Sequence, residues 1–290
     1  MRAWTTRNEV GTRFRTAIVS RLSVMAVATL SYVVLVFGFL SGYEPDGSGF
    51  APTADAINAF LPRYIDWSVT VPLLTVELLA VCTLVGQVAR RTRAIAVALA
   101  FLMIFTGFIG AFVVDDGRNL EALVVWGAIS AVFWIATNVV LIGAVRRSLP
   151  QLTPEEAGLI KRATVILLGG WIIYPVVYLI PLLGMSGGAT TTMQLALCAA
   201  DVLVKVGFGG HIHRIAKLRT AEDVRAGDDI HAESIWISSE KQSDAGSARE
   251  VYLADGAAAH LRRVRPPMTF ATTEDASALG DQRELDLDDV

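Results

Sequence analysis

The sequence predicts an all-α membrane protein, a bundle of helices that cross the bilayer. Hydrophobic residues make up 53% of its 290 residues. Mean hydropathy is +0.50, which is too apolar for an ordinary soluble domain. Apolar runs of about 20 residues, the length that spans a bilayer, alternate with short polar connections. Such runs are expected to be helical because bilayer lipid cannot hydrogen-bond to the backbone. The six runs are 16–40, 63–88, 94–114, 121–145, 158–183 and 193–215.

Charges in the connections alternate and predict the orientation of the bundle. Residues 1–15 are basic, and so are the connections after the second, fourth and sixth runs. Connection 42–62 is acidic, and connection 184–192 is uncharged. Basic connections face the cytoplasm. We therefore expect a multi-pass protein of the cell membrane, surrounded by lipid, with both termini cytoplasmic.

Composition divides the chain into three parts. A basic cytoplasmic segment (1–15) precedes a transmembrane bundle (16–216), and an acidic tail (217–290) follows it. From residue 220 onward the tail holds 16 Asp and Glu against 7 Lys and Arg and has no spanning run. We expect a largely disordered cytoplasmic tail, either solvated or docking an unidentified partner.

Several functional classes lack support in the sequence. No Cys/His zinc spacing and no phosphate-binding glycine motif are present, and both cysteines, Cys82 and Cys198, lie inside apolar runs. We expect no metal site and no nucleic-acid partner.

The last apolar run contains a lysine, Lys205, near its middle, with Asp201 one helical turn earlier. Charged groups at this depth are costly and are functional candidates by default. A buried ion pair that only joins helices is one interpretation. The other is that Lys205 carries a carbonyl cofactor as a Schiff base and Asp201 is its counter-ion.

The second run carries a further polar constellation. Arg63, Asp66 and Thr70 share one helical face because they are three and four residues apart. Glu77 lies eleven residues after Asp66, close to three turns, so the two carboxylates point the same way about 16 Å apart. Proton sites above and below Lys205 suit vectorial proton transfer. Carboxylates that only complete buried polar networks are the alternative.

Three motifs carry a resemblance to a known family. They are Arg63-Tyr-Ile-Asp-Trp67 with Thr70-Val-Pro-Leu-Leu74, Trp171-Ile-Ile-Tyr-Pro175 and Asp201-xxx-Lys205-Val-Gly-Phe-Gly209; Met103-Ile-Phe-Thr-Gly107 agrees more weakly. Over about residues 8–215 the chain resembles the microbial rhodopsins, in particular the light-driven proton pumps of the proteorhodopsin and xanthorhodopsin group.

The resemblance implies the cofactor and the roles of individual residues. Lys205 would bind all-trans retinal as a protonated Schiff base, with Asp66 as proton acceptor and Asp201 as second counter-ion. Glu77 would be the cytoplasmic proton donor, Arg63 would gate release, and Thr70 would bond the acceptor. The residues that match the retinal pocket are Tyr32, Trp67, Leu74, Met103, Gly107, Trp171, Tyr174 and Pro175.

The chain departs from the family pattern in its helix count. The family has seven helices; residues 8–32 match its first loop and second helix, so the first helix is the one not seen. A misassigned start and a genuine truncation are the alternatives. Gly127 matches a glycine that opens the pocket wall to a carotenoid antenna, although a plain helix-packing glycine explains it too.

The implied function is a light-driven outward proton pump, an ion translocator and not an enzyme, expected as a homo-oligomer. A sensory rhodopsin that signals through a partner, by way of the acidic tail, is the alternative. Glu77 favours the pump because a sensor needs no proton donor.

Overall fold

A computed structural model describes residues 10–53, 61–179 and 186–226. The chain forms two units, Met1–Thr220 and Ala221–Val290, and the features below belong to the first unless stated otherwise. Most of the predicted acidic tail, from residue 227 onward, lies outside the described residues.

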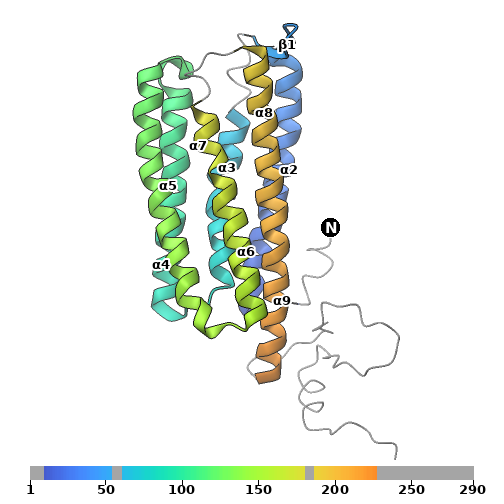
Figure 1. Ribbon diagram of the computed structural model, residues 1–290, viewed down its shortest axis with the longest axis vertical. Helices are drawn as coiled ribbons and strands as arrows, with labels where there is room; N and C mark the ends of the chain where they lie inside the picture. Colours follow the sequence, from blue (N-terminus) through green and yellow to red (C-terminus); the bar gives the residue numbers. More distant parts are fainter. Residues whose placement is uncertain (1–9, 54–60, 180–185, 227–290) are drawn as a thin grey trace, which may run out of the picture. The chain divides into compact units, whose positions relative to one another are not determined.

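The described part is almost entirely helical, as predicted. Its long helices lie side by side along the vertical axis of Figure 1. They are α2 (Arg15–Gly42), α3 (Leu61–Ala80), α4 (Gly86–Phe108), α5 (Leu120–Ser148), α6 (Pro154–Trp171), α8 (Gly187–Val202) and α9 (Gly209–Ala226). The short helix α7 (Ile173–Tyr178) follows α6, and the π-helix η8 (Leu203–Phe208) joins α8 to α9. A π-helix, η4 (Ile109–Val113), and a 3-10 turn, η5 (Asp115–Gly117), follow α4. Two further 3-10 turns are η2 (Thr12–Phe14) and η6 (Leu149–Gln151).

These elements make six segments of membrane-crossing length. Five described segments are both long and apolar enough to span a bilayer. Helix α3, with 20 residues, is the sixth. It carries three ionisable residues, Arg63, Asp66 and Glu77, which make it more polar than the others. The six predicted spans are therefore all present as helices.

The second span ends earlier than predicted. Helix α3 ends at Ala80, and α4 begins at Gly86, whose φ of +61° lies in the left-handed region. A glycine adopts this conformation without a steric penalty, which allows the chain to turn there. The basic cluster Arg90, Arg91 and Arg93 consequently lies in the first turns of α4, not in a connection.

Pro175 explains the break between α6 and α7. Proline has no N–H, so the carbonyl of Trp171, four residues earlier, loses its helical donor. Helix α6 ends at Trp171, and α7 begins at Ile173. The break places two predicted pocket residues, Trp171 and Tyr174, on either side of an irregular turn.

A small hairpin fixes one end of α8. Strands β1 (Tyr43–Pro45) and β2 (Phe50–Pro52) are antiparallel. Asp46, in their turn, accepts hydrogen bonds from Ser48 Oγ (2.8 Å) and from the backbone N–H groups of Ser48, Gly49 and Gly187. Gly187 is the first residue of α8, where unpaired N–H groups favour a carboxylate.

The described start of the chain packs against α9. Val10 and Phe14 are fully buried in the main core cluster. The N–H of Gly11 donates to Thr220 Oγ1 at 2.9 Å, and the Arg219 guanidinium lies 5.0 Å from the centre of the Phe14 ring. The first and last described elements of the bundle are thus neighbours.

Apolar side chains cover the outer faces of the helices. On α2 the exposed large residues include Leu30, Val33, Phe37 and Leu40. A soluble protein does not normally expose such a surface, whereas lipid is compatible with it. The buried polar side chains, in contrast, include Arg63, Asp66, Glu77, Asp201 and Lys205. This inverted distribution makes the interior of the bundle the candidate functional site.

Candidate functional site

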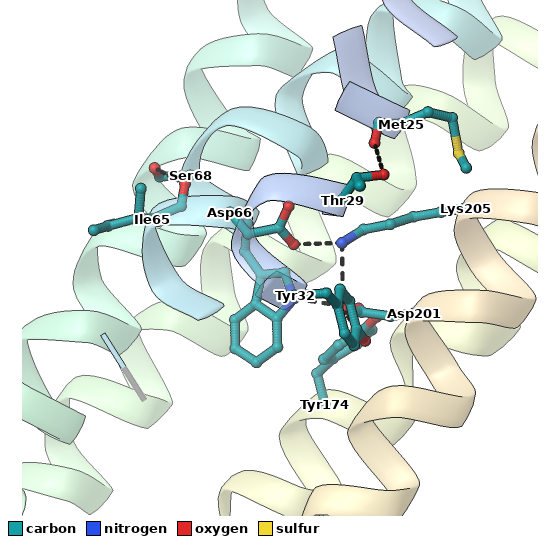
Figure 2. Close-up of polar contacts among 10 residues, drawn as sticks. Met25, Thr29, Tyr32, Ile65, Asp66, Ser68, Tyr174, Asp201 and Lys205 are labelled. Carbon is teal, nitrogen blue, oxygen red and sulfur yellow. Dashed lines mark hydrogen bonds and ion pairs between the residues drawn. The ribbon is translucent and has the colours of Figure 1, made fainter. Parts of the chain in front are cut away.

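Lys205 lies at the centre of the site, inside the π-helical turn η8. Its side chain is only 5% exposed, and its Nζ donates to Asp66 Oδ2 and, at 3.3 Å, to Asp201 Oδ2. Figure 2 shows both carboxylates converging on this amine. Irregular π-turns in helices frequently mark functional sites. The predicted association of Lys205 with both aspartates is confirmed, whereas the π-helical turn was not predicted.

Asp201 is surrounded by hydrogen-bond donors. Its Oδ2 accepts from Tyr32 at 3.0 Å, and its Oδ1 accepts from Tyr174 at 2.5 Å and from Trp67 Nε1 at 3.3 Å. With Lys205, four side chains donate to this carboxylate. The three aromatic residues, predicted only as pocket walls, therefore also hold Asp201 in place.

Asp66 has a different environment, although it is equally buried. Its Oδ2 accepts from Lys205, but its Oδ1 has no hydrogen-bond partner. The predicted bond from Thr70 is absent in this structure: Thr70 is fully buried, yet its Oγ1 is also unpartnered. Sharing a helical face brings two side chains near each other but does not orient them, which is why the spacing could not settle this bond. Asp66 thus keeps one oxygen available to take a proton.

Arg63 reaches across to α8 and does not pair with Asp66. Its Nη2 donates to Gln194 Oε1 at 2.8 Å and to Cys198 Sγ at 3.3 Å. Its guanidinium lies 5.9 Å from the centre of the Tyr32 ring. Sequence reasoning missed both partners. The signal was present, because 194, 198, 201 and 205 are spaced by four, three and four residues and so share one helical face.

Glu77 lies on the other side of Lys205 from the two aspartates. It is 1% exposed, and its Oε1 lies 3.8 Å from Nη1 of Arg21, which extends from α2. A Cβ placed on Gly209 would collide with the Arg21 guanidinium and lie 3.2 Å from Glu77 Oε1. Sequence reasoning missed Arg21. An arginine inside the first apolar run was itself the signal.

Most predicted pocket residues lie in one core around Lys205. Trp67, Leu74, Met103 and Trp171 are buried, and Tyr174 packs against the same cluster. The rings of Trp67 and Tyr174 meet edge to face, with centroids 5.2 Å apart. Pro175 lies in the short helix α7 and is partly exposed.

The two predicted pocket-wall glycines both lie close to Tyr178. A Cβ on Gly127 would lie 2.7 Å from Cε1 of Tyr178. The Tyr178 hydroxyl donates to the carbonyl of Gly107 at 3.3 Å. Close packing of this tyrosine is a sufficient reason for glycine at position 127. This agrees with the alternative interpretation of Gly127 as a helix-packing glycine.

Comparisons with known proteins show which proteins the chain resembles. A family model described as bacteriorhodopsin-like protein matches residues 1–218. Sensory rhodopsin-2 of Natronomonas pharaonis is 31% identical over 213 residues, which cover 71% of this chain and 78% of that protein. Bacteriorhodopsin of Haloterrigena sp. (strain arg-4) is also 31% identical, over 53% of this chain and 59% of that protein.

Solved structures of rhodopsins have a fold similar to that of this chain. Xanthorhodopsin, described as a light-driven ion pump with dual chromophore, superposes with a TM-score of 0.68 at 28% identity. The match covers 76% of this chain and 87% of that one. A thermophilic rhodopsin, at 24% identity and a TM-score of 0.66, supports the fold alone.

Proposed function

Because this chain belongs to the bacteriorhodopsin-like family of microbial rhodopsins, we propose that it is a light-driven outward proton pump with all-trans retinal on Lys205. The observation that carries the proposal is the unequal environment of the two carboxylates beside Lys205. Asp201 has four donors, while Asp66 has one donor and one unpartnered oxygen.

The residues around Lys205 fit retinal. A buried primary amine can condense with an aldehyde, and the two adjacent carboxylates neutralise the charge of a protonated nitrogen. Flat aromatic and apolar side chains, among them Trp67, Trp171 and Leu74, suit a long polyene. The unpartnered oxygens of Asp66 and Thr70 leave hydrogen-bonding capacity in the same buried region.

When bound, retinal supplies light absorption and a change of shape that alters the surroundings of the Lys205 nitrogen. Asp66 then accepts the proton from that nitrogen, because one of its oxygens lacks a competing donor. Asp201 stays in place beside that nitrogen, since four side chains donate to its carboxylate. Arg63, held by Gln194 and Cys198 on α8, supplies a fixed positive charge near Tyr32.

Glu77 returns a proton to the Lys205 nitrogen from the opposite side. It lies against Gly209, one helical turn beyond Lys205, whereas Asp66 contacts the amine itself. The basic connections of the sequence support a cytoplasmic position for the Glu77 side. Proton release on the Asp66 side and uptake on the Glu77 side therefore give outward transport.

The second candidate is a photosensor that signals through a partner. It is favoured by the 31% identity to a sensory rhodopsin, which shows that membership of this family alone does not select a pump. A carotenoid antenna is not included in the proposal, because the Tyr178 ring occupies the space beside Gly127.

To test this proposal, the full chain is expressed in cells supplied with retinal. The cells are then illuminated in unbuffered medium while the pH of the medium is recorded. Acidification that a protonophore abolishes supports the pump. Pigment formation without a change in pH would overturn the pump and favour the sensor. Lys205→Ala tests the attachment site, and a pigment that persists in this variant would refute it.

A further inference from the structure

We propose that Arg21 is a positioning residue whose fixed positive charge stabilises the carboxylate that Glu77 becomes when it returns its proton to the Lys205 nitrogen. In this step the O–H bond of Glu77 breaks and an N–H bond forms at Lys205, so the negative charge stays on Glu77. The inference rests on the proposed function of Glu77 as the donor. It assigns a role to an arginine that the family resemblance does not include.

Glu77 is enclosed by protein and holds its proton in the dark. Its side chain is 1% exposed, and its Oε1 has no hydrogen-bond partner. Burial disfavours the charged form of a carboxyl group, and here it outweighs the attraction of Arg21. Among the residues that the structure describes, Arg21 is the only charged group that acts on Glu77. Loss of the proton therefore creates a charge with a single nearby cation to balance it.

The packing of three helices holds Arg21 next to Glu77. Arg21 comes from α2, Glu77 from α3 and Gly209 from the start of α9. A Cβ at position 209 would collide with Arg21 Nη1, so the guanidinium occupies space that only a glycine leaves open. The Arg21 side chain is 16% exposed, and an arginine keeps its proton in such surroundings. The positive charge is thus in place before Glu77 ionises.

The distance between the two groups suits a carboxyl that ionises only temporarily. Arg21 Nη1 lies 3.8 Å from Glu77 Oε1, beyond hydrogen-bond distance, and neither atom has a hydrogen-bond partner. A neutral acid gains little from this cation, whereas a carboxylate at the same place is attracted to it. A charge that already faces the position where the opposite charge develops accelerates the step. Arg21 should therefore speed proton transfer from Glu77 and delay the return of a proton to it from the cytoplasm.

The first test measures how fast the Lys205 nitrogen regains its proton after a light flash, in the full chain with retinal in lipid. Arg21→Gln should slow this step about tenfold, the effect expected when one charge-assisted contact is lost. Arg21→Lys, which keeps the charge, should retain most of the rate. Arg15→Gln replaces an exposed arginine on the same helix and should behave as the wild type. A wild-type rate in Arg21→Gln would overturn the inference.

A second pair of variants moves the cation without removing it. Gly209→Ala should push the flexible end of Arg21 out of its place and slow the same step. Gly210→Ala, at the next position of α9, adds a methyl group with nothing within 4 Å and should leave the rate unchanged. Equal rates in these two variants would contradict the role given to the position of the guanidinium.

Infrared difference spectra follow the charge of Glu77 itself. The carbonyl stretch of its protonated carboxyl, identified by its absence in Glu77→Gln, should be lost as the Lys205 nitrogen regains its proton. The stretch should return sooner in Arg21→Gln than in the wild type, because the anion is less stable without the cation. A residue that only supported the packing would not change the lifetime of the anion, so equal lifetimes would also overturn the inference.

The outcomes separate the two proposals. If Glu77→Gln slows reprotonation of Lys205 and Arg21→Gln does not, Glu77 remains the donor and the role of Arg21 is refuted. If Glu77→Gln leaves the rate unchanged, the donor role fails and the role of Arg21 fails with it. Added to Glu77→Gln, Arg21→Gln should have no further effect, and an additional loss would show that Arg21 does not act through Glu77.

Discussion

Asp201 and Asp66 both accept a hydrogen bond from the amine of Lys205. Asp201 also accepts hydrogen bonds from three further side chains, and none of these three donates to Asp66. Two chemically identical groups on one cation thereby have different hydrogen-bonding environments. The difference arises from their neighbours on α2, α3 and α7, not from their position along the chain.

Replacement of Asp66 by Asn should abolish proton transport while pigment still forms. The amide cannot take a proton, and general-base catalysis of this kind contributes a factor of about 100 or more. Light-induced acidification by cells measures the effect. Ser68→Ala, on the same helix, removes only a bond to the Ile65 carbonyl and is the control. Undiminished transport in Asp66→Asn would exclude Asp66 as the acceptor.

Replacement of Asp201 by Asn should mainly reduce stability. The change leaves the hydroxyls of Tyr32 and Tyr174 without an anionic acceptor and removes a buried charge beside Lys205. Breaking a buried ion pair costs about 3 kcal/mol. Thermal bleaching of the pigment checks this, and a midpoint equal to that of the wild type would contradict the central role of Asp201.

Substitution of Gly127 by Ala should destabilise the bundle by about 1–3 kcal/mol, because the added methyl group meets the Tyr178 ring. Gly143→Ala lies in the same helix, α5, with nothing near the added methyl group. That control should be stabilised by about 0.5–1 kcal/mol, as expected for a helix interior. Thermal unfolding in lipid compares the two, and equal effects would mean that Tyr178 does not constrain position 127.

The hairpin contact of Asp46 should make stability depend on pH. Hydrogen bonds from Ser48 Oγ, the Ser48 N–H and the N–H groups of Gly49 and Gly187 hold the pKa of the Asp46 carboxyl below its ordinary value. A lowered pKa in the folded state stabilises the fold above the pKa of the unfolded chain, about 4, and the effect is lost as pH falls below it.

Asp46→Asn tests this dependence. The variant should be less stable than the wild type at neutral pH, and the difference should shrink once pH drops below about 4. Thermal unfolding across pH 3 to 7 measures the gap, because this range runs from about one unit below the ordinary Asp pKa to about three units above it. A gap that is constant over this range would show that the carboxylate charge plays no part.

Helical spacing predicted some of these contacts and not others. The pairing of Asp201 with Lys205 follows from a separation of four residues on one helix. The partnerships of Arg21 with Glu77 and of Arg63 with Gln194 join different helices, and no periodicity within one helix encodes them. The six spans followed from apolar length, but the end of α3 depends on the backbone conformation at Gly86, and the π-turn at Lys205 has no local sequence signal. The helical spacing of Thr70 and Asp66 also did not predict that the Thr70 hydroxyl has no hydrogen-bond partner.

The hydrogen bond from Gly11 to Thr220 joins residues 209 positions apart in the chain. Positions that begin and end the bundle are therefore already in contact, as the ends must be for circular permutation. A chain opened within the turn at Gly47, with a short linker from residue 220 to residue 10, would keep the helix neighbours and only reorder their synthesis. The order in which the helices emerge from the ribosome is thus separable from the arrangement in which they pack.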